Sequence, residues 1–462
     1  MKHLLFILTL LFNIQVTLSQ IFEIDNIEIS GDQDNRINLV ILSEGYQSSE
    51  LAKFITDATN FTNSMFTMSP FSEYSNYFNV YALKVPSNES GADRPSTSTY
   101  VDTFFNATYE AFGSPYLLYY EIDGNSANNT EAKILNVLAD NFPTYDLALI
   151  LVNSNEYGGS GGVFPMAYSG YWGANVIVHE MGHSLFNLKD EYYPGDVLGA
   201  EAINMTQETD PNLVRWKNWL YDNGVGIYQY FDNNVPKDWY KPHQNCIMEK
   251  IDKTFCSVCK EGIVEKIHEL ISPIDNYTPN NNTVENPSSF PLDFMLNLIK
   301  PIPNTLESVW TLNGSNFANN VDGVSLLETN LMEGENTLTA VIHDNTSFQR
   351  VDNHNNFHVS LVTWTINYTT LGVEDIESKI DSYSISMFPN PASTTVNFMH
   401  EGKADSNLNI ELVSLEGRMV KSVKISNLES YQLDISNLNQ GIYIANFYSG
   451  KILIANKKLV KR

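Results

Sequence analysis

The sequence has few basic residues, and this scarcity excludes one large class of partners. Its 462 residues include 27 lysines and arginines against 54 aspartates and glutamates, which gives a formal net charge of −27 at pH 7. Such a surface would repel the phosphates of a nucleic acid rather than neutralise them. We therefore predict that the protein does not bind nucleic acid.

Long apolar runs are also absent beyond the first residues. The chain begins Met1-Lys2-His3 and continues with a largely apolar run over residues 4–12. A more polar stretch follows and ends near Gln20. A basic start with a short apolar core is typical of a cleavable signal peptide, whereas a membrane span needs about 20 apolar residues. We expect residues 1–20 to be removed on export, and the mature chain to have no transmembrane segment.

Cysteine is rare, and the three that occur, Cys246, Cys256 and Cys259, fall in one short segment. In an exported protein an odd count indicates a disulfide with one leftover thiol, or a small metal site. We expect a local disulfide between Cys246 and one of the other two. The alternative is a zinc site that adds His243 or His268, which is disfavoured because structural zinc sites usually have two separated ligand pairs.

What the chain does contain is enough apolar material for packed cores. Hydrophobic residues make up 43% of the sequence and aromatic residues 12%, so a disordered protein is excluded. A chain of 462 residues is too long for one ordinary domain, and two to four are expected.

The most informative stretch runs from His179 to His183 and reads His-Glu-Met-Gly-His. Histidines four residues apart project from the same face of a helix, so that both can bind one Zn²⁺ while Glu180 reaches a water on the metal. Glu180 would accept a proton as this water attacks a peptide carbonyl, and would return it to the leaving amine. This pattern predicts a zinc hydrolase, and first of all a peptidase.

A third protein ligand is needed, and the usual one is missing. The metzincin pattern has a histidine six residues after the second, where this chain has Lys189, and Phe186 replaces the glycine at which the chain turns. Because an ammonium group cannot bind zinc, we predict that Asp190, the nearest anionic donor, is the third ligand. A carboxylate that holds a ligating histidine is the other role open to Asp190. The competing carboxylates are Glu191 and, from a second helix, Glu201 and Glu208.

Three further side chains that follow this motif in the sequence have two interpretations each. Tyr192 and Tyr240 are candidate donors to the oxyanion, although packing is the more common role of a tyrosine. Met248 either lies beneath the metal in a tight turn, as in metzincins, or is ordinary core.

Apolar periodicity predicts strands alternating with helices before the motif. Strands are expected over 21–29, 36–42, 77–85 and 147–152, and helices over 48–65, 131–140 and 176–188. The glycine-rich run 157–162 lacks the lysine and spacing of a phosphate-binding loop, and we expect a flexible loop beside the active site. The pattern favours a mixed α/β domain with the motif on a helix.

Beyond residue 270 the pattern changes to short strands and turns. We expect two small all-β, sandwich-like domains without catalytic clusters. The predicted organisation is a signal peptide at 1–20, a catalytic domain at 21–275, a linker at 276–289, a β-sandwich at 290–368, a linker at 369–384 and a final β-domain at 385–462.

The first domain resembles the IgA peptidase family of secreted zinc endopeptidases. The resemblance covers about residues 25 to 270 and rests on Asn35-Arg36-Ile37-Asn38-Leu39-Val40, Ser43-Glu44-Gly45-Tyr46, Tyr77-Phe78-Asn79-Val80, Tyr157-Gly158-Gly159-Ser160-Gly161-Gly162, the His179 to His183 motif and Asp190-Glu191-Tyr192. It implies a zincin-like α/β fold with His179, His183 and Asp190 around one Zn²⁺. It does not carry over IgA as the substrate, because specificity depends on pocket loops.

The last block is similar to type IX secretion sorting domains. The motifs are Phe388-Pro389-Asn390-Pro391-Ala392, Leu415-Glu416-Gly417-Arg418, Leu438-Asn439-Gln440-Gly441-Ile442-Tyr443 and a basic end from Lys457 to Arg462. The resemblance implies recognition by the type IX secretion machinery, passage across the outer membrane, and a location outside the cell or on its outer surface.

Together these observations favour a secreted zinc endopeptidase that hydrolyses extracellular proteins or peptides. Two alternative functions are compatible with the same motifs. One is a zinc amidase acting on non-protein substrates, and the other is a non-catalytic surface adhesin. The intact Glu180 speaks against the adhesin, because a decayed site would be free to lose its base.

Overall fold

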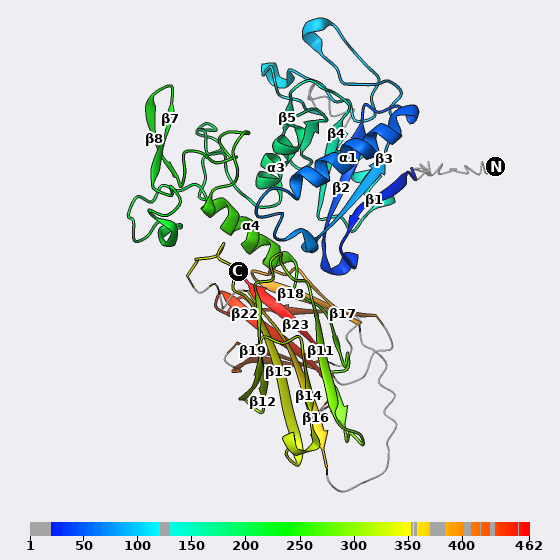
Figure 1. Ribbon diagram of the computed structural model, residues 1–462, viewed down its shortest axis with the longest axis vertical. Coiled ribbons are helices and arrows are strands. Elements are labelled where there is room, and N and C mark those ends of the chain that lie inside the picture. The colour runs from blue at the N-terminus through cyan, green and yellow to red at the C-terminus, as the bar shows by residue number, and fades with distance from the viewer. Residues whose placement is uncertain are drawn as a thin grey trace, which may run out of the picture. The chain divides into compact units, whose positions relative to one another are not determined.

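The computed structural model describes residues 20–120, 130–352, 354, 358–369, 384–401, 408–415, 417–425, 430–450 and 452–462 (Figure 1). All but the last residue of the predicted signal peptide, 1–20, lies outside these ranges, as does most of the predicted linker 369–384. The chain divides into two compact units. The first contains the described residues of Met1–Ile29, Asn38–Ser64 and Val80–Ser184, and the second contains Ser30–Ile37, Met65–Asn79 and those of Leu185–Arg462.

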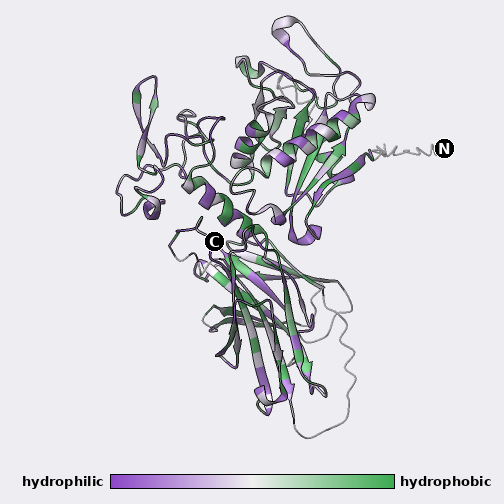
Figure 2. Cartoon of the chain, in the orientation of Figure 1, coloured by the Kyte–Doolittle hydropathy of each residue, from purple (hydrophilic) through white to green (hydrophobic). Residues whose placement is uncertain are grey.

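A six-stranded mixed sheet forms the centre of the first unit. Its order is β1 (Glu23–Ile29), β3 (Phe78–Lys84), β2 (Ile37–Glu44), β4 (Leu147–Val152), β6 (Met166–Tyr168) and β5 (Gly159–Ser160). β4 runs parallel to both β2 and β6, whereas β5 is antiparallel to β6. Every residue of β2 and β4 is buried, as expected for strands covered on both faces. The central strands of this sheet are mainly hydrophobic (Figure 2).

The helices of this region are α1 (Leu51–Met65), α2 (Thr130–Asn141) and α3 (Gly173–Ser184). α2 matches the predicted helix closely, and α1 follows a 3-10 turn over Ser48–Glu50 where the helix was expected to begin. α3 ends at Ser184, although the apolar pattern predicts a helix as far as Leu188. The chain leaves the helix because Asn187 adopts a left-handed conformation with φ of 56°.

The second unit begins its regular structure with the hairpin of β7 (Tyr228–Asp232) and β8 (Val235–Lys241) and with helix α4 (Ser257–Leu270). An eight-stranded β-sandwich follows. One sheet has the order β10 (Thr283–Glu285), β16 (Val359–Tyr368), β15 (Gly334–Asp344), β12 (Leu306–Leu312) and β13 (Ser315–Asn319), and the other has β14 (Gly323–Leu326), β11 (Leu292–Leu298) and β9 (Ile274–Thr278).

The core of this sandwich is built around two tryptophans. Trp310 and Trp364 are fully buried, and their rings stack with centroids 5.7 Å apart and an interplanar angle of 4°. β9 and β10 occupy much of the segment 276–289 that the sequence predicts to be a linker. Residues 279–282 form the turn between these strands, and Asn282 Nδ2 donates a hydrogen bond of 2.7 Å to the Thr363 carbonyl.

The C-terminal region is also entirely β among its described residues. One sheet has the order β17 (Ser384–Phe388), β18 (Thr395–Glu401) and β21 (Ser430–Asp434), and the other has β20 (Met419–Ile425), β19 (Leu408–Ser414), β22 (Gly441–Ser449) and β23 (Ile452–Lys461). Their core includes Val396, Phe398, Ile410 and Phe447. The expected succession, a mixed sheet with helices and then all-β sheets, is confirmed. Within the described ranges, no helix has the length and apolar character needed to cross a membrane.

Candidate active site

Helix α3 presents the two histidines of the motif on one face. Val176, Ile177, Val178, Met181 and Gly182 are buried, and α3 packs against β5 and β6, which fixes the rotation of the helix about its axis. His179 is buried and His183 is half-buried, and their rings lie 4.9 Å apart at an angle of 84°. The i, i+4 spacing therefore places both histidines on one face of the helix, as the sequence predicts.

The geometry of this pair fits a metal ion. The two Nε2 atoms lie 3.3 Å apart. Two imidazole nitrogens bound at about 2.0–2.1 Å to a tetrahedral Zn²⁺ are separated by about 3.3 Å. One carboxylate oxygen of Glu180 lies within 4.8 Å of both histidine donor atoms. His179, Glu180 and His183 thus form a compact group capable of holding and serving a metal.

The glycine-rich run lies directly against this group. A Cβ atom on Gly161 would collide with Oε2 of Glu180, and a Cβ on Gly159 would collide with Val176 of α3. Ser184 Oγ donates a hydrogen bond of 2.8 Å to the carbonyl of Gly162. Glycine is required because backbone and helix approach closely, and part of the run is the strand β5 rather than an irregular loop.

Asp190 follows α3 and belongs to the second unit. Its side chain is half-buried, and its main-chain carbonyl accepts a hydrogen bond of 2.6 Å from Tyr230 Oη. Because the histidines belong to the first unit, the role of Asp190 as third ligand stays a prediction.

The distant competitors for the third ligand have local partners. Glu201 accepts hydrogen bonds of 2.8 Å from Thr206 Oγ1 and from the amide of Gln207. Glu208 accepts two of the same length from the amides of Thr209 and Asp210. Neither residue lies in a helix, so the expectation that they come from a second helix is wrong.

Glu191 points to a different set of residues. Its side chain is fully buried, and Oε1 lies 3.1 Å from Cys259 Sγ and 3.3 Å from Asn204 Nδ2. Burial raises the pKa of the Glu191 carboxyl well above its usual range. Within the second unit this carboxylate faces the cysteines.

The three cysteines are free thiols, contrary to the expected disulfide. Cys246 Sγ and Cys259 Sγ lie 3.7 Å apart, whereas a disulfide requires about 2.05 Å. The histidines considered as partners have other contacts: His243 Nε2 lies 3.2 Å from the Asn223 carbonyl, and His268 Nε2 lies 2.8 Å from Asp344. The fourth member of the cysteine group is Glu191. Sequence reasoning missed it because Glu191 is far from the cysteines along the chain.

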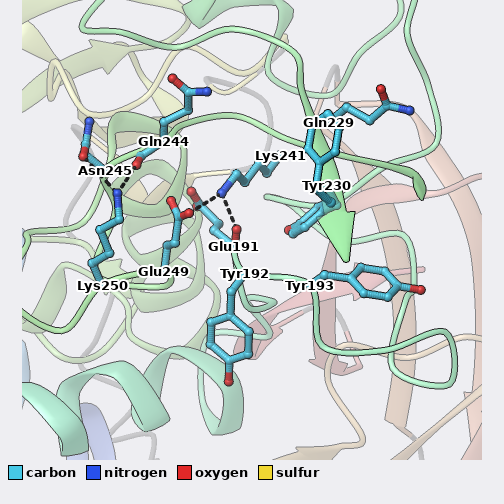
Figure 3. Close-up of a pocket in the computed structure, with 11 residues that line it drawn as sticks. Glu191, Tyr192, Tyr193, Gln229, Tyr230, Lys241, Gln244, Asn245, Glu249 and Lys250 are labelled. Atoms are coloured by element: carbon cyan, nitrogen blue, oxygen red, sulfur yellow. Dashed lines mark hydrogen bonds and ion pairs between the residues drawn. The ribbon is translucent and has the colours of Figure 1, made fainter. Parts of the chain in front are cut away.

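A pocket of about 460 Å³ lies beside this segment and is shown in Figure 3. Lys241 donates hydrogen bonds within it to the main-chain carbonyl of Glu191 and, over 2.9 Å, to Glu249. Tyr192 lines the pocket and is 50% exposed, so it does not belong to the buried core. Met248 is fully buried, and its carbonyl accepts a hydrogen bond of 2.7 Å from the Glu191 amide.

The model of the family described as IgA Peptidase M64 matches residues 26–235. The matched segment comprises 210 of the 462 residues. A second model, of the secretion system C-terminal sorting domain, matches residues 386–462. Both resemblances inferred from the sequence are confirmed. The M64 match indicates a protease of a metallopeptidase family, and the sorting domain implies export by type IX secretion.

Curated proteins give no match to the sequence. Among solved structures, latent PorU from Porphyromonas gingivalis is 15% identical over 40% of this chain and 19% of its own length, with a TM-score of 0.15. Beta-glucuronidase 3 from Bacteroides uniformis is 12% identical over 46% and 27%, with the same TM-score. The chain therefore spans less than a third of the length of either protein.

Proposed function

We propose that this protein is a secreted zinc endopeptidase in which His179, His183 and Asp190 hold one catalytic Zn²⁺ and Glu180 is the general base. The observation that carries the proposal is the histidine pair on α3, with Nε2 atoms 3.3 Å apart and Glu180 beside them, inside the region matched by the M64 peptidase family. On this proposal the first unit has a zincin-like fold, in which the motif helix packs beneath the edge of a mixed sheet.

The side chains have distinct roles in the proposed reaction. A bound zinc ion would supply Lewis acidity and make a water molecule acidic enough to deprotonate near neutral pH. Glu180 accepts the proton of the attacking water and then delivers it to the nitrogen of the leaving amine. Gly161 lets the backbone lie against the Glu180 carboxylate, which limits the positions that this base can adopt.

Export and organisation complete the proposal. Residues 1–20 serve as signal peptide, 21–273 as catalytic domain, 274–368 as the β-sandwich that begins with β9, and 385–462 as the tail recognised by the type IX secretion machinery. Support comes from the sorting-domain match over residues 386–462. The protein would act outside the cell or at its outer surface on extracellular proteins or peptides.

Replacing the proposed base tests the chemistry directly. In Glu180→Gln we expect metal content to remain and cleavage of a denatured protein substrate to fall by about 10²- to 10⁴-fold, because the amide cannot accept the proton. Glu23→Gln is the matched control, since this carboxylate lies on β1 and is 75% exposed. Equal activity in Glu180→Gln and the control would remove the assigned role. Hydrolysis of cell-wall or glycan amides without protein cleavage would favour the amidase instead.

A further inference from the structure

A second group of metal-binding side chains lies in the second unit, away from the histidine motif in sequence. It consists of Glu191, Cys246, Cys256 and Cys259, all buried, with ligand atoms within 4.8 Å of one another. Cys256 precedes the first residue of α4, and Cys259 lies in its first turn. Four donors from three separate segments therefore converge on one point in the interior.

The distances within this group match the edges of a metal tetrahedron. Two thiolates bound at about 2.3 Å to a tetrahedral Zn²⁺ are about 3.8 Å apart, and a thiolate and a carboxylate oxygen are about 3.5 Å apart. Cys246 Sγ and Cys259 Sγ are separated by 3.7 Å. Glu191 Oε1 lies 3.1 Å from Cys259 Sγ and 3.8 Å from Cys256 Sγ. The Cys246–Cys259 and Glu191–Cys259 distances are shorter than the expected values, and the Glu191–Cys256 distance is longer.

Among the residues that the structure describes, no cationic side chain pairs with the Glu191 carboxylate to offset its burial. The side chain is 0% exposed, and Oε2 has no hydrogen-bond partner within the same described ranges. Lys241, the nearby ammonium group, donates instead to the main-chain carbonyl of Glu191 and pairs with Glu249. An isolated buried carboxylate is costly, whereas one that binds a metal is compensated. The Glu191 carboxylate, which faces the cysteines, therefore favours a cation bound between it and the three sulfur atoms.

Backbone donors further favour thiolates at this point. The amide of Cys256 donates a hydrogen bond of 3.3 Å to Cys246 Sγ. Cys256 and Cys259 lie at the N-terminal end of α4, where the free amides and the helix dipole stabilise negative charge. Burial raises the pKa of the Cys256 and Cys259 thiols, and the end of α4 opposes this effect only in part. Thiolates are the form in which cysteine binds metal, so a bound cation would complete their stabilisation.

We infer that Cys246, Cys256, Cys259 and Glu191 bind a second metal ion, a structural Zn²⁺ with four protein ligands. The inference does not rest on the proposed peptidase activity, because no residue of the histidine motif takes part. A Cys246–Cys259 disulfide would use two of the thiols but leave Glu191 and Cys256 buried without a cation. Three thiolates and one carboxylate form a closed coordination shell, which is typical of structural rather than catalytic zinc.

Cobalt distinguishes this site from the histidine site, because only thiolate ligands give intense sulfur-to-Co²⁺ charge-transfer absorption. The full chain is stripped with a chelator under reducing conditions and reloaded with Co²⁺ alone. We expect two ions per chain and the charge-transfer band in the wild type, and one ion with the band unchanged in His183→Ala. Cys259→Ser should lose one ion and most of the band. Absence of the band from the wild type would overturn the inference.

Thiol counting tests the competing disulfide without any variant. In the metal-loaded native protein the three cysteines should resist a thiol reagent, and all three should react after denaturation with a chelator. One reactive thiol in the denatured, unreduced protein would reveal a disulfide and refute the metal site. Because band and thiol count do not depend on substrate cleavage, an inactive protein with both signatures would contradict the peptidase proposal alone.

Discussion

Gly161→Ala is the substitution that separates positioning of the proposed base from its chemistry. The Cβ atom of alanine would collide with Glu180 Oε2, while the nearest atom of His183 lies at an ordinary contact distance of 3.8 Å. Gly161 does not have a left-handed φ, so alanine fits the backbone, and the carboxylate must move by on the order of 1 Å. Both histidine nitrogens keep their places.

Displacement of a catalytic group by about 1 Å costs roughly 100-fold in rate, or about 2.7 kcal/mol of activation free energy. We therefore expect kcat of Gly161→Ala on a peptide substrate to fall by about that factor, with unchanged zinc content and little change in Tm. Gly162→Ala is the matched control, because a Cβ there meets no atom within 4 Å even though its φ of 123° strains an alanine. Its expected effect is on stability rather than on kcat. A Gly161→Ala enzyme with kcat within twofold of wild type would refute the placement of Glu180 as the base.

Three further predictions concern the rest of the chain. Asp190→Ala should lose the catalytic zinc and chelator-sensitive cleavage, as measured by metal analysis; zinc retained in the variant would move the third ligand elsewhere. Burial raises the pKa of Asp344, but its bond to His268 and other hydrogen bonds outweigh this and leave the pKa below its usual range. The resulting stability is present above the unfolded pKa of about 3.9 and is lost as pH falls through the folded pKa, so the Tm advantage of wild type over Asp344→Asn should shrink on acidification below about pH 4. Trp364→Ala should destabilise the β-sandwich by about 3–5 kcal/mol in denaturant unfolding, against a small effect of Val309→Ala on the surface of the same sandwich.

Local features of this chain are predictable from sequence because their causes are local. The histidine pair follows from the i, i+4 spacing, and the buried strands β2 and β4 follow from short apolar runs. The predicted end of α3 at Leu188 is wrong, and the helix ends at Ser184. The apolar pattern continues to Leu188, but Asn187 turns the backbone out of the helical path. Apolar periodicity shows which side chains are apolar, but it does not show the backbone conformation of a single residue.

Tertiary neighbours are harder to predict, and the cysteine group shows why. Spacing alone indicates that Cys256 and Cys259 can act together, since they are three residues apart at the start of a helix. Nothing in the spacing indicates Glu191, which reaches them only because the segment after α3 packs beside Cys246 and α4. For the same reason Asp190 and Glu191 could not be distinguished as ligands from their order along the chain.

The adjacency of Asp190 and Glu191 links the two proposed metal sites. The Glu191 side chain faces the cysteines, and the two neighbouring carboxylates can serve different ions if the Asp190 side chain points to another side of the backbone. The segment is held at both residues: Tyr230 Oη donates to the Asp190 carbonyl over 2.6 Å, and the Glu191 amide donates to the Met248 carbonyl over 2.7 Å. A metal bound by Glu191 would add a third restraint one peptide bond from the proposed catalytic ligand. Loss of the cysteine site should therefore raise the Kd for zinc at the histidines, although that site still fills at saturating metal, whereas loss of the histidine site should leave the cysteine site intact. That asymmetry follows because Asp190 depends on the path of the chain around it, while the cysteines are anchored by α4.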